Sequence, residues 1–178
     1  LPYFRERTFA GPDGRFRSIP AVDDETANYE SSWEEWQPDV SLRWSQVLGQ
    51  FDVGAFYFYG TSRDPLFQPI AGGTRLRPVY NLMHQVGTDI QWTHEAWLLK
   101  FEGIHRSGRG QQFQAAVGGF EHPFYQIFGS NIDLGALTEY HYDSRGNAAL
   151  NPFNHDFFFG TRLGFNDEQA TAILAGGF

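Results

Sequence analysis

Cysteine is absent from the 178 residues, and lysine and methionine occur once each, as Lys100 and Met83. The absence of cysteine excludes disulfide frameworks, cysteine-based zinc sites and thiol catalysis. Basic residues number 13 against 21 acidic ones, a net charge of −8, so no nucleic-acid partner is expected, because such proteins carry a basic surface. No run approaches the ~20 consecutive apolar residues that a transmembrane helix needs.

Aromatic residues are abundant, at 17% of the chain, and glycine occurs 20 times. From Asp39 onward, apolar and polar residues alternate with the period of two that is typical of strands. This alternation predicts an all-β, antiparallel fold, with residues 1–35 as a long extracellular or constriction-type loop and residues 36–178 as strands and their connections. The expected strands are Asp39–Val47, Phe51–Tyr59, His84–Thr93, Ala96–Arg106, Phe113–Phe124, Ile132–Asp143, Asp156–Asn166 and Thr171–Phe178.

The alternation separates the strand residues into two faces. One face is apolar and contains no Asp, Glu, Lys or Arg, although His105 and His122 lie on it. Its aromatic residues gather near the strand ends, as in the girdles of membrane barrels. The predicted lipid-facing girdle is Trp44, Tyr59, Trp92, Trp97, Tyr142 and Phe157. The other face alternates glycine with a set of charges that we call the charge ladder: Arg43, Asp89, Lys100, Glu102, Arg106, Glu121, Glu139 and Arg162.

Two architectures can produce this pattern. A soluble lipocalin-like barrel turns its apolar face inward, whereas a transmembrane barrel turns it toward lipid and its polar face toward the lumen. Aromatic girdles with aliphatic residues between them favour the transmembrane barrel, and so does the single lysine, since soluble sheets usually guard their edges with several. The sequence therefore predicts an up-and-down transmembrane β-barrel with a mixed-charge lumen.

Three segments carry a resemblance to a known family: Arg43-Trp44-Ser45 through Phe51-Asp52-Val53-Gly54, Gly60-Thr61-Ser62-Arg63-Asp64-Pro65, and Lys100-Phe101-Glu102-Gly103-Ile104-His105-Arg106-Ser107-Gly108. They resemble Gram-negative outer-membrane β-barrel proteins of a porin-like kind, over most of the chain from about residue 39. The resemblance implies location in the outer membrane and passive or weakly selective passage of small polar solutes. It implies no catalytic residue and no cofactor.

Other functions stay open. A soluble lipocalin-like barrel would bind a small apolar ligand. An outer-membrane lipid-modifying enzyme would need a His, a Ser and an acid near the rim, and His105 and Ser107 lie two residues apart. Glu139, His141 and Asp143 share a face and could hold a metal ion or orient a general base, or simply line the lumen.

The charges of neighbouring strands are expected to pair. If His94-Glu95 is a two-residue turn, Asp89 faces Lys100 across the hairpin. The ladder is then either a structural set of ion pairs or a transverse field across a pore that selects solutes. In the connection Gly60–Tyr80, Arg63, Arg75 and Arg77 could bind lipopolysaccharide phosphates or pair with the chain's own carboxylates.

The lengths of the connections suggest a larger barrel. Short connections are periplasmic and long ones extracellular in such proteins, which would place both ends of this chain outside the cell. Because bacterial barrels usually begin and end in the periplasm, and the sequence has neither an initiator Met nor a signal segment, we expect at least one further strand on each side. Ten or more strands could enclose water, whereas eight fill their interior with side chains.

Overall fold

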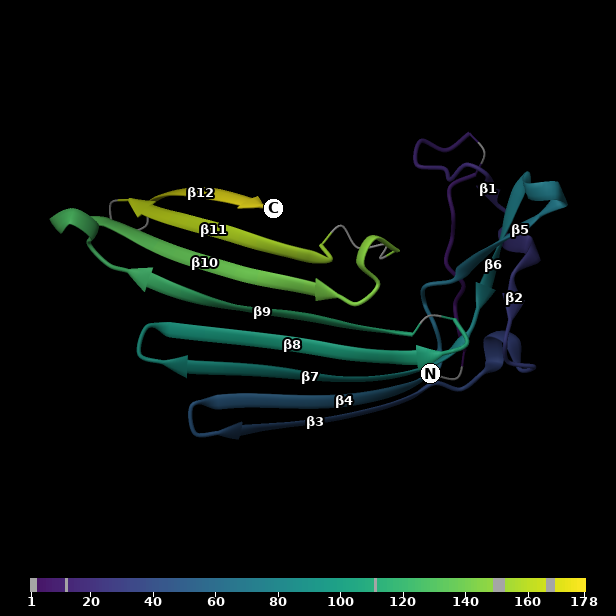
Figure 1. The fold of residues 1–178 in the computed structure, drawn as a ribbon, viewed down its shortest axis with the longest axis horizontal. Helices are drawn as coiled ribbons and strands as arrows, with labels where there is room; N and C mark the ends of the chain where they lie inside the picture. The colour runs from purple at the N-terminus through teal and green to yellow at the C-terminus, as the bar shows by residue number, and fades with distance from the viewer. Residues whose placement is uncertain (1–2, 12, 111, 149–152, 166–168) are drawn as a thin grey trace. The chain divides into compact units, whose positions relative to one another are not determined.

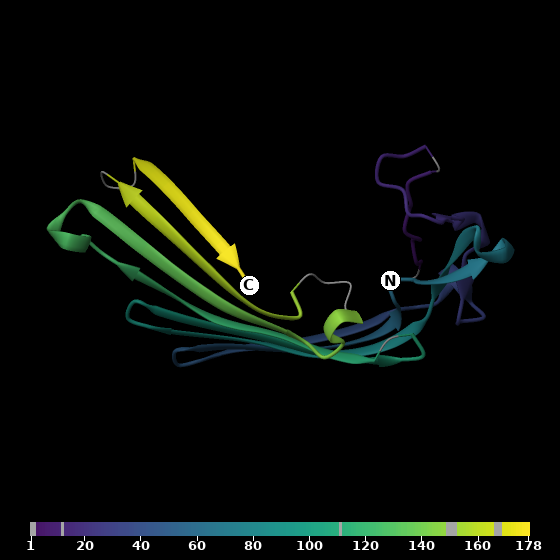
Figure 2. The same cartoon turned by 45° about the horizontal axis from the view of Figure 1, so that its top comes forward.

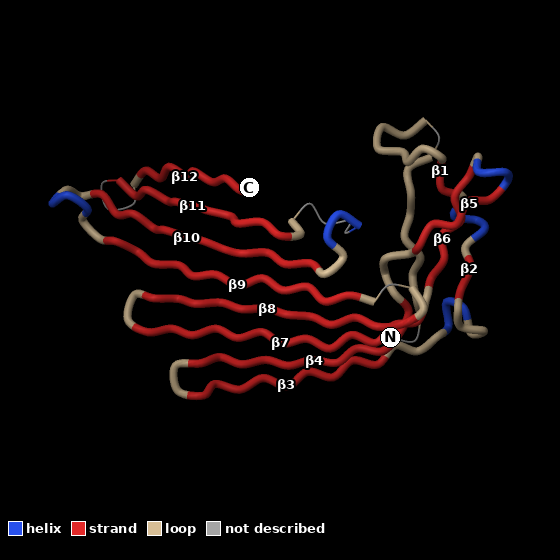
Figure 3. Tube along the Cα trace, viewed as in Figure 1, coloured by secondary structure: helices blue, strands red, loops and turns tan. Residues whose placement is uncertain are grey.

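The computed structural model describes residues 3–11, 13–110, 112–148, 153–165 and 169–178. The all-β prediction is confirmed: no α-helix occurs among these residues, and the short segments drawn in blue in Figure 3 are 3-10 turns. No helix in this part of the chain could cross a membrane. Two compact units can be distinguished: the first contains residues 1–42, 57–85 and 106–112, and the second contains residues 43–56, 86–105 and 113–178.

The larger sheet is antiparallel and has eight strands in the order β12-β11-β10-β9-β8-β7-β4-β3 (Figure 1). The strands are 8 to 13 residues long, against about 5–6 in ordinary globular proteins. Their bounds are β3 Val40–Leu48, β4 Phe51–Thr61, β7 Leu82–His94, β8 Trp97–Gly108, β9 Phe113–Phe124, β10 Ile132–Asp143, β11 His155–Phe165 and β12 Ala170–Gly177. Each bound lies within two residues of its prediction, and those of β9 and β10 coincide with it.

A smaller sheet lies in the first unit. The strand β6 (Arg75–Tyr80) pairs in parallel with β1 (Ala21–Val22) and β2 (Asn28–Tyr29), and antiparallel with β5 (Leu66–Ile70). Sequence reasoning had left these segments as loops. Short 3-10 turns complete the chain: η1 Asp24–Thr26, η2 Glu34–Trp36, η3 Ala71–Gly73, η4 Ile127–Gly129 and η5 Gly146–Ala148.

The first unit has an aromatic core. Phe4 and Tyr80 are each 1% exposed, and their ring centroids lie 5.0 Å apart. Tyr29 stacks on Tyr80 at 5.3 Å, and the Arg63 guanidinium lies 4.6 Å from the centre of the Phe4 ring. The small sheet and the N-terminal segment are thus joined by buried rings.

The second unit has no comparable core. The register of β9 to β11 places Leu134 opposite Phe124 and Leu163, which are on one face, and Figure 2 shows that the sheet bends between β8 and β12. Large apolar residues of this face are exposed, from 36% for Tyr142 to 75% for Ile173. Among the described residues nothing covers them.

The larger sheet has two free edges. β12 and β3 stand at the ends of the strand order, and in the described part of the chain each pairs on one side only. The described strands therefore form an open sheet.

Candidate functional site

The charged face of the larger sheet holds two ion pairs between strands. Arg43 on β3 donates to Asp89 on β7, with Nη1–Oδ1 at 2.9 Å and Nη2–Oδ2 at 3.1 Å. Lys100 on β8 donates to Glu121 on β9, with Nζ–Oε1 at 2.6 Å. All four side chains are partly exposed, so each pair contributes about 1 kcal/mol or less in water. Their main effect is to fix the positions of the charges.

Glycine makes the first pair possible. The Arg43–Asp89 contact crosses the intervening strand β4, where a Cβ on Gly54 would lie 2.4 Å from Asp89 Oδ2. A Cβ on Gly87 would likewise lie 2.4 Å from the Phe56 ring. The glycines of this face therefore leave room for a layer of larger side chains from neighbouring strands.

A cavity of about 510 Å³ opens on this face. Both members of the Arg43–Asp89 pair line it, together with Lys100, Asp52 and Glu102. Neither Asp52 nor Glu102 contacts a cationic group among the described residues. The cavity is therefore a polar hollow with two unmatched carboxylates, and Asp52 was not among the residues predicted for the charge ladder.

The predicted pair of Asp89 with Lys100 does not form. The β7–β8 turn consists of Glu95-Ala96 rather than His94-Glu95, and Glu95 adopts a left-handed conformation with φ of 51°. A shift of one residue in a hairpin changes every cross-strand partner. The two charges instead pair with Arg43 and Glu121.

The remaining ladder residues are spread over both units. Arg106 belongs to the first unit, where its Nε donates to Gln85 Oε1 at 3.0 Å. Arg162 and Glu121 line a second cavity of about 690 Å³ in the second unit. Glu139 Oε2 lies 3.4 Å from His141 Nε2.

The three side chains proposed for a metal ion or a general base, Glu139, His141 and Asp143, do not converge on one point. Glu139 contacts His141, but Asp143 is held by Arg145. No group of three or more His, Asp or Glu side chains in the described ranges is arranged to hold a metal ion. The buried Nδ1 of His105 has no hydrogen-bond partner in this part of the chain.

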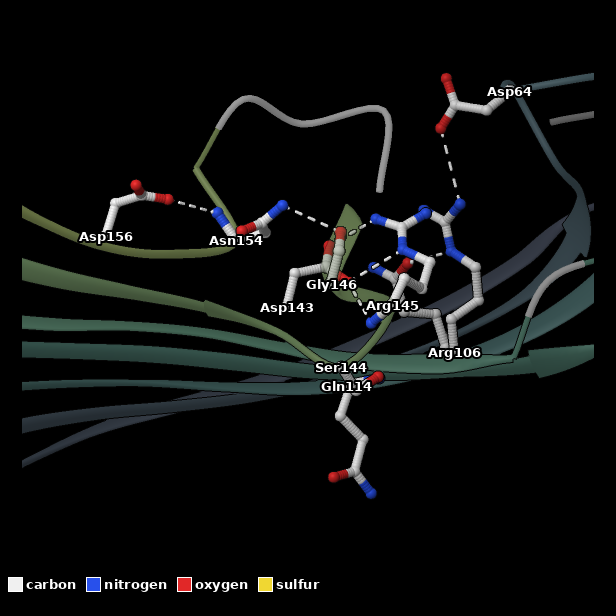
Figure 4. Close-up of polar contacts among 10 residues, drawn as sticks. Asp64, Arg106, Gln114, Asp143, Ser144, Arg145, Gly146, Asn154 and Asp156 are labelled. Carbon is white, nitrogen blue, oxygen red and sulfur yellow. Dashed lines mark hydrogen bonds and ion pairs between the residues drawn. The ribbon is translucent and has the colours of Figure 1, made fainter. Parts of the chain in front are cut away.

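In the second unit, several polar contacts meet where the β10–β11 connection leaves β10 (Figure 4). The Asp143 carboxylate is 1% exposed and accepts from Arg145 Nε at 2.9 Å and Nη2 at 2.5 Å. The Arg145 guanidinium lies 3.6 Å from the centre of the Phe113 ring. Ser144 and Gln114 exchange two hydrogen bonds, each of 2.9 Å. Sequence reasoning missed this anchor, for which Asp143-Ser144-Arg145-Gly146 was the only local signal.

The far end of the same connection is also held. Asn154 Nδ2 donates to Gly146 O at 2.9 Å, and the Asn154 amide donates to Asp156 Oδ2 at 2.7 Å. The Asp143 amide donates to Asn154 O at 3.2 Å. The two described ends of the connection therefore fasten to each other.

Several residues of the predicted girdle make ring contacts with histidines. In the first unit, Tyr59 packs on His84 at 4.7 Å. In the second unit, His122 lies 4.2 Å from Trp97, and His155 lies 5.1 Å from Tyr142. Further ring contacts in the second unit include Trp92 with Phe51 at 6.3 Å and Phe157 with Tyr140 at 4.8 Å. Trp44 is exposed.

Two of the arginines considered for lipopolysaccharide contact the chain's own carboxylates. Arg63 Nη2 lies 3.7 Å from Asp39 Oδ2, and Arg75 Nη1 lies 2.8 Å from Asp23 Oδ2. Arg77 Nε is buried without a hydrogen-bond partner in the described part of the chain. Lipopolysaccharide binding stays a prediction, and these contacts favour the internal alternative.

Comparison with known proteins gives no match to a family model, a curated protein or a solved structure.

Proposed function

We propose that this chain forms part of a transmembrane β-barrel of the Gram-negative outer membrane, and that small polar solutes pass along its charged face. The observation that carries this proposal is the distribution of side chains on the larger sheet. Its apolar face is exposed over many strands, whereas its other face carries paired charges and glycines. Lipid outside and water inside would satisfy both faces.

The strand lengths support this proposal. A strand needs about 9–11 residues to cross the hydrocarbon layer at a tilt of ~45°, and most strands of the sheet have 11 to 13. A soluble lipocalin-like barrel would instead bury the apolar face. The exposure of Leu99, Phe101 and Phe120 therefore disfavours that alternative.

The free edges also fit this proposal. In a bilayer, the unpaired N–H and C=O groups of β3 and β12 would each cost several kcal/mol. We infer that these edges pair in the membrane, either with each other or with further strands.

Cell fractionation and conductance test the proposal. In Gram-negative cells that make the protein, it should remain in the outer-membrane fraction until detergent is added. The purified protein should then conduct ions across a planar lipid bilayer. Recovery in the aqueous phase without detergent would overturn the membrane assignment, and an inserted protein without conductance would overturn the transport role.

The role of the charges can be tested separately. Glu102→Gln and Glu121→Gln should each shift ion selectivity toward anions, by roughly 1.5- to 2-fold in the permeability ratio, because each removes a negative charge from the pore wall. The shift should be larger for Glu121→Gln, which also leaves Lys100 unmatched. The reversal potential in a KCl gradient measures it.

Glu95→Gln is the matched control, because this carboxylate lies in the β7–β8 turn and its loss should leave selectivity unchanged. If Glu102→Gln and Glu121→Gln both behave like the control, the charged face does not line the path.

A further inference from the structure

The cavity of about 510 Å³ on the charged face carries an excess of negative charge. Its two cationic groups already have partners, because Arg43 binds Asp89 and Lys100 binds Glu121. The Glu102 carboxylate lines the same cavity without a cationic partner among the described residues. A cation that enters the cavity therefore meets an unpaired carboxylate, whereas an anion meets only cations that are already paired.

The strand register places Glu102 next to a second carboxylate. Because the β7–β8 turn has two residues, Glu95-Ala96, each residue of β7 has a fixed partner on β8, and Glu102 stands opposite Asp89. The hydrogen bond from Arg106 Nε to Gln85 Oε1, at 3.0 Å, fits the same register. Like charges directly opposite each other are destabilising. One of these two carboxylates is neutralised by its ion pair, and a cation beside Glu102 would neutralise the other.

An apolar row lies beside these carboxylates. Phe56 lines the cavity, and its ring covers Gly87, where a Cβ would lie 2.4 Å from it. Gly87 precedes Asp89 by two residues on β7, and Ile104 follows Glu102 by two residues on β8. Residues spaced by two on a strand share a face and lie about 7 Å apart. Ile104 also lines the cavity, so carboxylates and apolar side chains stand next to each other in it.

We propose that this cavity binds a small organic cation that carries an apolar group, such as an arylalkylammonium ion. The ammonium group donates to the Glu102 carboxylate, while the apolar group packs against Phe56 and Ile104. The inference rests on the proposed function, because it names a substrate class for the solutes that pass along the charged face.

An inorganic cation fits this cavity less well. The described ranges contain no group of three or more His, Asp or Glu side chains arranged to hold a metal ion, and K⁺ or Na⁺ gains little from an apolar wall. The volume of about 510 Å³ lies within the range of ~300–1,000 Å³ that is typical of sites for small organic ligands. Only an organic cation uses both the charge and the ring.

Blockage of the current by 2-phenylethylammonium tests the proposal, with 2-phenylethanol as its neutral counterpart. In a planar lipid bilayer, the ammonium ion should reduce the K⁺ current through the protein in a saturable way, and the alcohol should not. The half-blocking concentration should rise about tenfold in Glu102→Gln, which loses a charged hydrogen bond. It should rise about fivefold in Phe56→Ala, which loses the aromatic contact with the cation.

Two variants outside the cavity are the matched controls. Glu95→Gln removes a carboxylate from the β7–β8 turn, and Phe158→Ala removes a ring from β11, where Phe158 is the register partner of Glu139. Both controls should be blocked at the wild-type concentration. The K⁺/Cl⁻ permeability ratio should change in Glu102→Gln but not in Phe56→Ala, so binding through the ring can be separated from charge selectivity.

The outcomes separate the inference from the proposed function. A conducting protein that 2-phenylethylammonium does not block, or blocks equally in the cavity variants and the controls, would overturn the organic-cation site and leave the pore intact. A block weakened in Glu102→Gln alone would also overturn it, because charge selectivity explains that result.

A protein that inserts but does not conduct would overturn the proposed function. Saturation-transfer NMR of 2-phenylethylammonium with the detergent-solubilised protein then decides the site by itself. Binding that is lost in both Glu102→Gln and Phe56→Ala supports the site, and absent or unchanged binding overturns it.

Discussion

In the first unit, the buried rings of Phe4 and Tyr80 pack together, and Tyr29 stacks on Tyr80. In the second unit, side chains of the same kind, such as Phe120 and Phe159, are exposed. Its buried residues instead include the carboxylate of Asp143. The two units therefore differ in that only the first contains a buried cluster of aromatic rings among the described residues.

The difference is one of packing rather than of total exposure. The first unit buries Phe4 and Tyr80 but leaves other rings exposed, such as Trp33 at 64% and Trp36 at 62%. The second unit exposes a broad apolar face, and exposed apolar patches of this kind mark sites where a protein binds a partner or a membrane. Three experiments test this difference between the two units.

The largest effect is expected in the aromatic core of the first unit. Phe4→Ala should lower the free energy of unfolding by about 3–5 kcal/mol, because it leaves a cavity among Tyr29, Tyr80 and Arg63. Phe159→Ala on the exposed face should cost about 1 kcal/mol or less. Denaturant unfolding in detergent, followed by near-ultraviolet circular dichroism, measures both. Equal losses would remove the contrast between the units.

A charge on the exposed face sharpens the comparison. Leu99→Arg should destabilise the protein in phospholipid vesicles by about 1–3 kcal/mol, because Leu99 lies on the proposed lipid-facing surface, two residues inside the predicted girdle residue Trp97. The control Ser45→Arg adds the same charge beside Arg43 on the other face of the sheet and should change stability by about 0.5 kcal/mol or less. Urea titrations of vesicle-folded protein compare them. Similar small effects would show that Leu99 faces water.

The smallest effect concerns pH and is expected only in the first unit. Burial and the hydrogen bond that its hydroxyl donates to Glu6 raise the pKa of Tyr29 above its ordinary value. Burial also raises the pKa of Tyr80. Because a raised folded-state pKa favours the protonated form, these phenols stabilise the fold fully below pH ~10, and this stability is lost as the pH rises further.

Tyr29→Phe tests this linkage. The variant should be about 1 kcal/mol less stable at pH 7, since a hydrogen bond is lost, but its stability should fall less steeply above pH ~10. Thermal unfolding measured from pH 8 to 11 gives the two slopes. Parallel curves for variant and wild type would show that Tyr29 does not carry the alkaline sensitivity.

Much of the larger sheet could be predicted from the sequence, because alternation is a local signal. β9 and β10 lie where expected, since each combines clear alternation with polar or glycine-containing flanks. The strands β5 and β6 were missed because Pro69 and Pro78 lie within them, and proline argues against a central strand. β1 and β2 have two residues each, too few for any period.

The details of the site were less predictable. Whether Lys100 faces Asp89 depends on the position of the β7–β8 turn, whose left-handed residue is Glu95, and no glycine marks that position. The Arg43–Asp89 pair reaches across an intervening strand, so it depends on the twist of the sheet as well as on hairpin register.

The contact between Asp89 and the bare backbone at Gly54 has a consequence for how this sequence can change. Any side chain at position 54 would occupy the space of the Asp89 carboxylate, and displacing that carboxylate would release Arg43. The identities of the residues at positions 43, 54 and 89 are therefore coupled. A larger residue at position 54 requires the Asp89 carboxylate to move, and a smaller residue at position 89 would remove that conflict at the expense of the ion pair with Arg43.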